Sequence, residues 1–490
     1  MTSKAGFRQA LLIGQGLGAS VLFAAAQPAW ADPANPTSVS EVEVVGQADA
    51  LSSPLQTQPL EDTPQTVSVV DDDTLRAQGV FSLRDSLRNI TGVSIVAGEG
   101  NPPSGDAMKI RGFAARDAIL VDGMRDVGNY LRDPFFAETI EVSQGPSSSY
   151  AGRATAGGSI NLVTRRPMSD DFGQAIVTGG TQSTIRGELD VNHVLSKSQG
   201  LAVRLNLMGH SGNEPGRDHV EHHRWGANLA LAWGLGSSTR VVGNLLHVEQ
   251  NDLPDLGLPN VRDFAMLGSG LEGRPAPVNM SNFYGYSTDY RDITADVFTL
   301  RADHVFHQGA TLTSQLRYGR TFNDSIVSAP RIQGQSNSIP FLGLPQPLLA
   351  ITPATQINGL QKPRTETDTL WANQTSLTVP FTSAGLRHAL VVGFDVTSDR
   401  ALNRRRIDIN GPATSLFTPV LQAAAPIAFQ GTRAQVRTDS TAGFVFDNIE
   451  FSRRLEANVG LRFDRLRTHV QSFDDTGLIP GYVQDLSRID

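Results

Sequence analysis

The chain has 490 residues, a length that allows more than one domain. Its formal net charge of −8 at pH 7 argues against a nucleic-acid partner, because such partners select a basic protein surface. Cysteine is absent, which excludes disulfides, thiolate metal sites and a cysteine nucleophile.

Residues 1–31 have the pattern of a cleavable secretory signal. Lys4 and Arg8 form a basic start, an apolar and small-residue run follows over 10–26, and residues 29–31, Ala-Trp-Ala, match the cleavage pattern. A membrane anchor is the alternative, but glycines interrupt the run. No later stretch has the ~18 apolar residues of a spanning helix, so we expect a periplasmic protein, a secreted protein or a barrel.

Residues 32–60 predict a flexible linker, because they are rich in proline, serine, threonine and glutamine. One segment within this linker alternates as a strand does. It consists of Glu41, Val42, Glu43, Val44, Val45 and Gly46. A short alternating segment in a flexible tail can pair with the sheet edge of another protein. The alternative is an edge strand of the domain that follows.

Residues 61–168 predict a small mixed α/β domain. Ser82 can cap a helix with one apolar face, and residues 122–123, Asp-Gly, are a strong signal for a tight hairpin. Short strands are expected at 66–70, 93–96, 108–112, 118–121, 139–143 and 159–164. The order of these elements predicts one compact unit ahead of a long strand-rich region.

Residues 169–490 predict an antiparallel transmembrane β-barrel. Apolar and polar residues alternate over about ten residues at a time, as strands between lipid and a wet interior require. Beyond the first hairpin, short and long connections alternate, which places the long loops at one end; a soluble β-sandwich does not sort its loops in this way. Eleven such segments lie near 172–181, 184–195, 200–210, 223–233, 239–249, 294–306, 310–321, 367–379, 387–398, 440–451 and 454–466.

The compact unit resembles the plug of TonB-dependent outer-membrane receptors, in particular ferric-siderophore receptors. The matching segments are DTPQTVSVV at 62–70, LRDSLRNITGVSI at 83–95, KIRGFAARDAILVDGMRD at 109–126 and TIEVSQGPSSSYAGRATAGGSINLVTRRP at 139–167. They follow the order of the family and cover nearly all of the unit. The segment EVEVVG at 41–46 resembles the TonB box of this family and lies where such a box belongs.

The resemblance implies a mixed α/β plug domain that fills a barrel of about 22 strands in the bacterial outer membrane. Ligand is expected to bind on the plug apices and the extracellular loops. TonB, with its energising inner-membrane proteins, is expected to pair with the box and remodel the plug, driven by the proton-motive force. A monomer in contact with outer-membrane lipid is implied, without a cofactor.

Two departures from the family pattern affect these expectations. The position before Gly-Pro is often basic in the family but is Gln144 here, which weakens the case for a plug–barrel ion pair at this position. Eleven strands are half of the family's number, and the last residues, DLSRID, lack the terminal aromatic of such barrels. We therefore expect a partial barrel, from a fragment or a truncated gene product, with an open sheet.

A site for a ferric siderophore would offer arginine and aromatic side chains to a polar or anionic chelate. The candidates in the plug are Arg111, Arg125, Tyr130 and Phe136, with Arg116, Arg132 and Phe135 in the same loops. The alternative is that the arginines pair with carboxylates such as Asp122, Asp126 or Glu138.

Catalysis and metal binding find little support in the sequence. There is no GxSxG elbow and no HExxH motif, so we do not expect an enzyme. Three histidines and a glutamate within 219–223 have the composition of a metal site, but alternation does not place them on one strand face. A solvated loop is the favoured interpretation, and no resident metal is predicted.

The leading interpretation is a TonB-dependent, energy-coupled outer-membrane receptor that imports a ferric siderophore. The alternatives are a receptor of the same class for haem, cobalamin or another metal complex, and a non-functional truncated fragment. A signal transducer of this family would carry an extra domain before its TonB box, and a passive porin would need neither plug nor box. The sequence does not distinguish a catecholate from a hydroxamate or mixed siderophore.

Overall fold

The computed structural model describes residues 51–96, 106–147, 150, 152, 156–261, 274–333, 351–452, 455–474 and 477–489. They belong to one compact unit, Ala48–Asp490. The predicted signal at 1–31 and the predicted TonB box at 41–46 lie outside the described residues. No helix in the described part of the chain is both long and apolar enough to cross a bilayer.

The first part of the described chain is a small mixed domain, as predicted. It contains a five-stranded sheet of order β1-β7-β8-β5-β6 and a three-stranded sheet of order β2-β3-β4. β5 and β8 are parallel, whereas β7 pairs antiparallel with both β1 and β8. The elements are η2 (Leu60–Asp62), β1 (Thr66–Asp71), α1 (Asp72–Gln78), α2 (Leu83–Ser86), β2 (Val93–Ile95), β3 (Met108–Ile110), β4 (Phe113–Ala114), η3 (Arg116–Ala118), β5 (Ile119–Val121), β6 (Met124–Arg125), η4 (Pro134–Phe136), β7 (Ala137–Gln144) and β8 (Gly158–Thr164).

Local sequence signals set the ends of these elements. The Asp71 carboxylate accepts a hydrogen bond from Thr74 N at 2.8 Å at the start of α1, and Ser82 Oγ accepts one from Asp85 N at 3.1 Å at the start of α2. The hairpin predicted at 122–123 joins β5 to β6, and its two residues have φ values of 51° and 80°. Positive φ at both positions is what a type I′ turn requires.

The second part is one large antiparallel sheet of order β21-β20-β19-β17-β16-β15-β14-β13-β12-β11-β10-β9, with β18 paired to β16. Each of the eleven predicted strands overlaps a strand of this sheet, whereas β21 and β18 were not predicted. The strands are β9 (Phe172–Gly179), β10 (Ile185–Ser196), β11 (Leu201–Asn213), β12 (Glu221–Trp233), β13 (Thr239–Leu253), β14 (Tyr290–Val305), β15 (Thr311–Ile332), β16 (Gln356–Ser383), β17 (Leu386–Arg406), β18 (Ile409–Ser415), β19 (Phe429–Ser452), β20 (Leu455–Asp474) and β21 (Gly477–Ile489).

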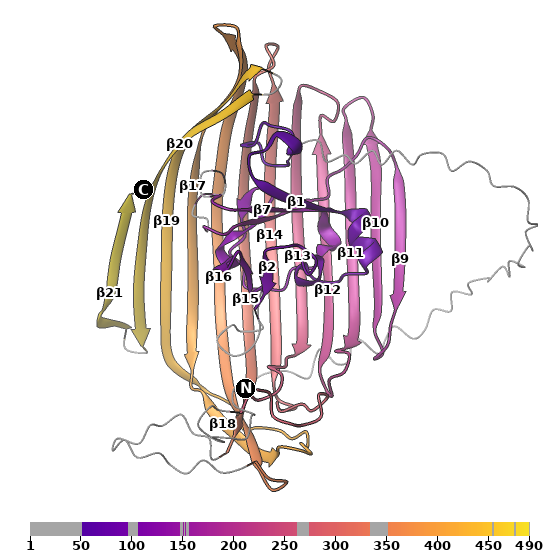
Figure 1. Ribbon diagram of the computed structural model, residues 1–490, viewed down its shortest axis with the longest axis vertical. Coiled ribbons are helices and arrows are strands. Elements are labelled where there is room, and N and C mark those ends of the chain that lie inside the picture. Colours follow the sequence, from indigo (N-terminus) through magenta and orange to yellow (C-terminus); the bar gives the residue numbers. More distant parts are fainter. Residues whose placement is uncertain are drawn as a thin grey trace, which may run out of the picture. The chain divides into compact units, whose positions relative to one another are not determined.

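The longer connections leave the sheet at one end, as the sequence predicted. They follow β11, β13, β15 and β17, and antiparallel order places all four at the same end, where β18 lies in Figure 1. The connections at the opposite end are short; the one between β16 and β17 has only two residues, Ala384 and Gly385. We call the end with the long connections the outer end.

The two faces of the sheet have the polarity of a membrane barrel. On β12 the outward side chains of Trp225, Leu229 and Trp233 are exposed, whereas the inward Asn228 is fully buried. Apolar residues outside and polar residues inside reverse the arrangement of a soluble sheet, and this is the pattern of strands between lipid and a polar interior.

The sheet is open within the described residues. β9 pairs with β10 alone and β21 with β20 alone, so each end strand has one edge without a partner strand there. The predicted half-barrel with an open sheet is therefore confirmed. Open edges carry unpaired N–H and C=O groups, which are costly in lipid.

The small domain packs against the inner face of the sheet, where β1 and β7 cross several sheet strands in Figure 1. One hydrophobic core joins the two parts. From the domain it takes Leu83, Ile110, Ile119, Ile140 and Ile160, and from the sheet Met208, Leu246, Val248, Ile293 and Val297. The small domain is hereafter the plug.

Candidate functional site: the contact between plug and barrel

Arg132 is the centre of a buried network in the plug, and its side chain is only 2% exposed. Its Nε lies 2.9 Å from Asp126 Oδ2, and its Nη1 lies 3.1 Å from Asp106 Oδ2. Its Nη2 donates to the carbonyls of Asp126 and Gly128 at 3.1 and 3.0 Å. The guanidinium is 4.4 Å from the centre of the Tyr130 ring, and the Tyr130 hydroxyl donates to Asp126 Oδ2 at 2.8 Å. We call Arg132, Asp106, Asp126 and Tyr130 the arginine hub.

The ionisation of the hub follows from burial and from neighbouring charges. Burial opposes ionisation of Asp126, but the positive charges of Arg132 and Arg317 outweigh it, so the pKa of this carboxyl lies below its usual value. At Asp106 burial dominates, and the pKa is raised in spite of Arg132. The surroundings therefore favour the ionised form at Asp126 more than at Asp106.

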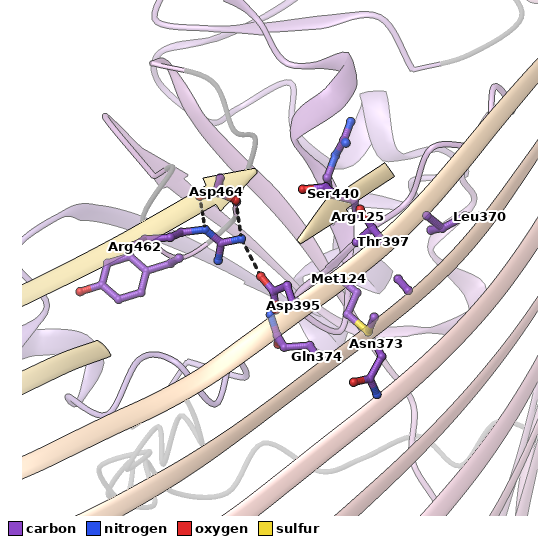
Figure 2. Close-up of a pocket in the computed structure, with 14 residues that line it drawn as sticks. Met124, Arg125, Leu370, Asn373, Gln374, Asp395, Thr397, Ser440, Arg462 and Asp464 are labelled. Atoms are coloured by element: carbon purple, nitrogen blue, oxygen red, sulfur yellow. Dashed lines mark hydrogen bonds and ion pairs between the residues drawn. The ribbon is translucent and has the colours of Figure 1, made fainter. Parts of the chain in front are cut away.

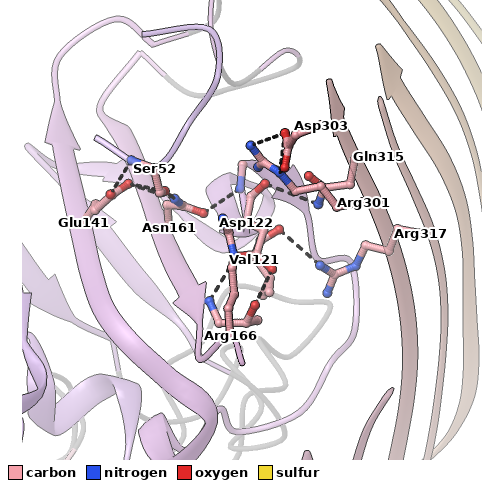
Figure 3. A network of polar contacts seen from close by, with 12 residues as sticks. Ser52, Val121, Asp122, Glu141, Asn161, Arg166, Arg301, Asp303, Gln315 and Arg317 are labelled. Carbon is pink, nitrogen blue, oxygen red and sulfur yellow. Dashed lines mark hydrogen bonds and ion pairs between the residues drawn. The ribbon is translucent and has the colours of Figure 1, made fainter. Parts of the chain in front are cut away.

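Two side chains of β15 connect the barrel to the plug, and Figure 3 shows both of them, Gln315 and Arg317, beside Val121 and Asp122 of the plug hairpin. Arg317 is fully buried; its Nη1 donates to the carbonyl of Val121 at 3.2 Å and its Nη2 lies 3.5 Å from Asp126 Oδ1. Gln315 Nε2 donates to the carbonyl of Asp122 at 3.4 Å. Gln315 and Arg317 both point inward because side chains alternate along a strand. Their hydrogen bonds attach the plug hairpin to the barrel.

Further ion pairs between plug and barrel lie nearer to β10. Arg186 contacts Asp133 with both terminal nitrogens, at 2.7 and 2.8 Å. Arg165 Nη1 lies 2.7 Å from Asp190, which also pairs with Arg204 at 2.8 Å. Breaking a buried pair by removing one partner costs about 3–5 kcal/mol, because the other charge is left without compensation. The plug therefore cannot move away from the barrel without a large input of free energy.

A separate chain of hydrogen bonds connects the hairpin to the first described residues (Figure 3). Gly123 N donates to Asn161 Oδ1 at 2.8 Å, and Asn161 Nδ2 donates to Glu141 Oε2 at 2.8 Å and to Ser52 Oγ at 2.9 Å. Ser52 N and Oγ donate to the two oxygens of Glu141, at 2.8 and 3.0 Å. The hairpin tip and the segment after the predicted TonB box thus share one polar network.

The plug contacts continue toward the outer end of the barrel. Beyond Arg317, Thr321 lies beside Gly128, where an added Cβ would come within 2.4 Å of Thr321 Oγ1. Asn129 Nδ2 then donates to Glu366 Oε2 at 3.4 Å. The stretch after the hairpin therefore runs toward the end of the barrel that carries the long connections. A glycine is required at position 128 because the backbone there comes close to β15.

Arg111 and Arg125, two of the predicted ligand residues, have accessible side chains. Arg111 is exposed, directly follows β3, and its Nε donates to Gln144 Oε1 at 3.3 Å. In Figure 1 the neighbouring β2 lies closer than β1 and β7 to the outer end. Gln144 also donates to the carbonyl of Thr91 at 2.7 Å, so it makes hydrogen bonds where a basic residue would make an ion pair. Arg125 is half-buried at the end of the hairpin.

Tyr130 and Phe136, the other two predicted ligand residues, are fully buried. Tyr130 belongs to the arginine hub, and Phe136 belongs to the hydrophobic core between plug and barrel. In this structure neither side chain offers a surface to a ligand, and their predicted ligand role stays a prediction. The sequence left open that the plug arginines pair with carboxylates instead of binding ligand. Arg132 does so in the structure, because it pairs with carboxylates of the plug.

A small cavity lies beside the hairpin, between Met124 and Arg125 of the plug and strands β16, β17, β19 and β20 (Figure 2). Arg462 crosses its wall, 2.7 Å from Asp395 and 2.8 Å from Asp464. Its free volume is about 50 Å³, which suits water and not a chelate of siderophore size. The cavity is therefore part of the contact between plug and barrel.

In the histidine-rich stretch at 219–223, His222 lies within hydrogen-bond distance of two carboxylates. His222 Nε2 lies 3.2 Å from Glu214 Oε2, and His222 Nδ1 lies 3.2 Å from Asp252 Oδ1. In the described part of the chain, no group of three or more histidine, cysteine, aspartate or glutamate side chains is arranged to hold a metal ion.

The long connections pack on one another at the outer end. Tyr284 donates to the carbonyl of Leu416 at 2.7 Å, and Tyr286 donates to the carbonyl of Pro412 at 2.9 Å and accepts from Gly359 N at 2.7 Å. A second hydrophobic cluster lies in the same region, formed by Val261, Ala276, Tyr284, Ile332, Ile357 and Leu416. The connection after β13 is thus fastened to the strands β16 and β18.

Asp289 makes the attachment of the connection between β13 and β14 sensitive to pH. It lies in the connection before β14, where its carboxylate accepts hydrogen bonds from Ser328 Oγ at 3.0 Å and Tyr286 N at 3.2 Å. Burial raises its pKa to about 6, although these hydrogen bonds oppose the shift. The folded connection thus binds this proton more tightly than the unfolded chain. Its contribution to stability is fully present below the ordinary pKa and is lost as the pH rises through about 6.

We expect the connection around Tyr286 to open more readily at pH 7 than at pH 5, and Asp289→Asn to remove most of this difference. The shift corresponds to roughly 3 kcal/mol at most. Hydrogen exchange of the Tyr286 region, corrected for intrinsic rates, measures the effect, with Asp218→Asn in the neighbouring connection as control. An equal pH response of the Asp289 variant and the unaltered protein would contradict the assignment.

Several residues of the site were not singled out from the sequence. Arg186 and Arg317 lie within predicted strands and Gln250 directly follows one, and Gln250 hydrogen-bonds both the N–H and the carbonyl of Leu131. Their positions on the polar face of each strand were readable from the alternation, but alternation does not tell which plug atom an inward side chain meets.

A plug of mixed structure, fastened by buried charges to the inner face of a sheet that is apolar outside, defines a plugged outer-membrane barrel. Family models agree with this class: "TonB-dependent Receptor Plug Domain" matches residues 59–159 and "TonB dependent receptor-like, beta-barrel" matches residues 225–487. The chain belongs to the TonB-dependent receptor family. Members of this outer-membrane family are transport receptors and not enzymes.

Comparison with individual proteins gives the same family. The chain is 32% identical over 441 residues to the catecholate siderophore receptor Fiu of Escherichia coli K12, covering 86% of this chain and 55% of the relative. It is 32% identical over 471 residues to the probable TonB-dependent receptor BfrD of Bordetella pertussis, covering 91% and 60%. The chain thus spans a little over half of the length of these relatives.

Solved structures confirm the fold. The crystal structure of Fiu from E. coli K12 in its open form has a TM-score of 0.79 at 28% identity, over 90% of this chain and 68% of that chain. The siderophore receptor PiuA from Acinetobacter baumannii has a TM-score of 0.77 at 25% identity, over 88% and 61%.

Proposed function

We propose that this chain serves in the energy-coupled import of a ferric siderophore across the outer membrane. The observation that carries the proposal is its 32% identity to a catecholate siderophore receptor over 86% of the chain. This similarity favours a catecholate complex as the ligand class. The receptor PiuA, whose structure is similar, is also named a siderophore receptor.

The buried plug contacts support import that consumes energy over passive diffusion. Arg186, Arg165 and Arg317 each make an ion pair between plug and barrel at positions closed to water. Opening a path between plug and barrel would break such pairs at about 3–5 kcal/mol each, which thermal motion supplies only rarely. TonB is the proposed source of this work, and the segment 41–46 is its proposed contact on this chain.

The proposed division of the chain follows from this mechanism. Residues 1–31 serve as the export signal, residues 32–60 as a periplasmic linker with the TonB box, residues 61–168 as the plug and residues 169–490 as part of the barrel. Within the plug, we assign Arg111 and Arg125 to ligand contact. We keep Tyr130 and Phe136 as proposed ligand contacts that only a rearranged plug would expose, because both are buried.

Growth of an iron-starved host on single purified siderophores tests the proposal. Deletion of the gene should abolish growth on ferric catecholates and leave growth on ferrichrome-type hydroxamates unchanged. Loss of growth on haem or cobalamin instead would favour the receptor of the same class for another complex. Unchanged growth on every iron source would favour the non-functional fragment.

Changing Arg111 or Arg125 to alanine should weaken binding of the ferric catecholate at the cell surface. Loss of a charge-assisted hydrogen bond corresponds to about 1.5–3 kcal/mol, or roughly ten- to hundredfold in Kd. Equilibrium binding to intact cells measures this, with Arg88→Ala as a matched control because Arg88 is exposed and pairs with Asp85 at 2.8 Å. Unchanged affinity with reduced receptor abundance would support a structural role of the two arginines.

A further inference from the structure

Six exposed arginines lie together on the outward face of three neighbouring strands. They are Arg400 and Arg404 of β17, Arg433 and Arg437 of β19, and Arg465 and Arg467 of β20. The strand register pairs Arg400 with Arg437 and Arg404 with Arg433, and it places Arg467 beside Asp439 and Arg465 beside Thr441. We call this set the basic outer patch.

The patch faces away from the plug. Ser398, on the same face of β17 as Arg400, pairs in register with Trp371, whose side chain is 55% exposed. The opposite face of the same strands carries Asp395 and Arg462, which line the cavity beside the plug. The six arginines therefore lie outside the barrel, on the surface that meets the membrane.

The basic outer patch lies at the depth of the lipid headgroups near the outer end of the barrel. The rings of Trp371 and Tyr318 are in tilted contact, their centres 4.6 Å apart, as in the aromatic girdles at membrane interfaces. Arg400 and Arg437 lie one step closer to the outer end than this aromatic pair, Arg467 is level with it, and Arg465 lies one step on its other side. From the level of Arg465 toward the opposite end, these strands carry exposed apolar side chains, namely Val392, Phe394, Val396, Val445, Leu461 and Phe463. An amphiphile can therefore place acyl chains on this apolar surface and its headgroup on the arginines.

The charge of the patch is hardly compensated. Among the side chains that the structure describes, one carboxylate, Asp439, pairs with the set, 3.1 Å from Arg437, and Arg400 donates to Gln435. The same level of the neighbouring strands is different, since Arg320 pairs in register with Asp296 of β14. Arginine forks match phosphate oxygens bidentately, and clustered arginines at a membrane surface each add about 1 kcal/mol of attraction to anionic lipid.

We propose that the basic outer patch binds the phosphorylated headgroup of a glycolipid in the outer leaflet. The ligand class follows from three features on the same surface: an uncompensated arginine cluster, its depth at the aromatic girdle and the apolar surface beneath it. A single phosphate would meet only two of the arginines, so the spacing of the six favours a headgroup with more than one phosphate. The proposal concerns the membrane-facing surface and is independent of which ligand the receptor imports.

The test uses receptor extracted from the outer membranes of its own host and two lipids with identical acyl chains, bisphosphorylated lipid A and its fully dephosphorylated form. Native mass spectrometry and equilibrium binding in detergent measure retention and Kd. We expect the receptor to retain the phosphorylated lipid, and its affinity to fall with rising salt. The combined variant Arg400→Gln, Arg437→Gln, Arg465→Gln, Arg467→Gln should bind it on the order of 1,000-fold more weakly.

Arg320→Gln is the matched control, because Arg320 lies at the same level outside the patch, and it should bind the lipid as the unaltered receptor does. Equal affinity for the two lipids, or unchanged affinity in the combined variant, would overturn the proposal. Displacement of the lipid by millimolar inorganic phosphate alone would also overturn it, since it would indicate a site for free phosphate. If the combined variant fails to fold, the preference of the unaltered receptor for the phosphorylated lipid decides the question.

Discussion

Replacing Val44 by proline is expected to reduce ferric-siderophore uptake to background while leaving binding at the cell surface intact. Val44 lies in the alternating segment 41–46, which we propose pairs with TonB as an added strand. Proline removes the backbone N–H that the added strand would donate and fixes φ near −65°. Transport of radiolabelled iron separates the two quantities, because binding is measured in de-energised cells and uptake in energised cells.

The control for this variant is a proline placed in the same linker outside the segment, Ala34→Pro, which should transport normally. Val44→Thr, which keeps the N–H and the preference for extended backbone, should retain most of the uptake. Uptake at the unaltered rate in Val44→Pro would refute the assignment of the segment as the TonB contact.

Replacing Arg132 by methionine is expected to loosen the plug. The substitution removes the closest cation from the buried Asp126 and leaves it only the more distant Arg317, while it keeps much of the side-chain volume. Breaking a buried pair by removing one partner costs about 3–5 kcal/mol. Asp126 loses the nearest of the charges that keep its pKa low, so this effect should grow as the pH rises. Hydrogen exchange of the plug amides around 121–133 and protease sensitivity of the plug measure the change.

Arg88→Met is the matched control, because Arg88 is exposed in the same plug and its pair with Asp85 is a surface ion pair of about 0–1 kcal/mol. The double variant Arg132→Met, Asp126→Asn should recover part of the lost protection, because the carboxylate left without Arg132 is removed; the recovery is incomplete because Arg317 then loses its partner Asp126. Unchanged exchange in Arg132→Met would mean that the hub does not hold the plug.

The hub and the hairpin network suggest how a ligand at the outer end and a partner at the other end act on the same element. The hairpin at 122–123 contacts Arg317 and Gln315 of the barrel through its backbone, and through Asn161 it is joined to Ser52. A pull on the segment that contains Ser52 would therefore act on Glu141 and Asn161, and through Asn161 on the hairpin. The same hairpin ends in Arg125, one of the proposed ligand contacts.

The sequence by itself determined the architecture of this protein, because its signals are local. Alternation with a period of two predicted eleven strands and their inward and outward faces, and the lengths of the connections predicted which end carries the long loops. The Asp-Gly pair predicted the hairpin, because a type I′ turn needs two residues that tolerate positive φ. β21 was not predicted, since proline and glycine interrupt its sequence, GLIPGYVQDL, and pairing with β20 outweighs this local preference.

Only the tertiary structure decided which polar side chains form the site. Arg111, Arg125 and Arg132 have the same chemistry and lie within one stretch of the plug, yet Arg111 is exposed whereas Arg132 is buried among Asp106, Asp126 and Tyr130. The partners of Arg132 within the plug are close in sequence, but the second arginine beside Asp126, Arg317, comes from β15, almost two hundred residues further along the chain. Alternation places a charge inside the barrel, and its partner there is set by the docking of the plug, which is a long-range contact that no local pattern contains.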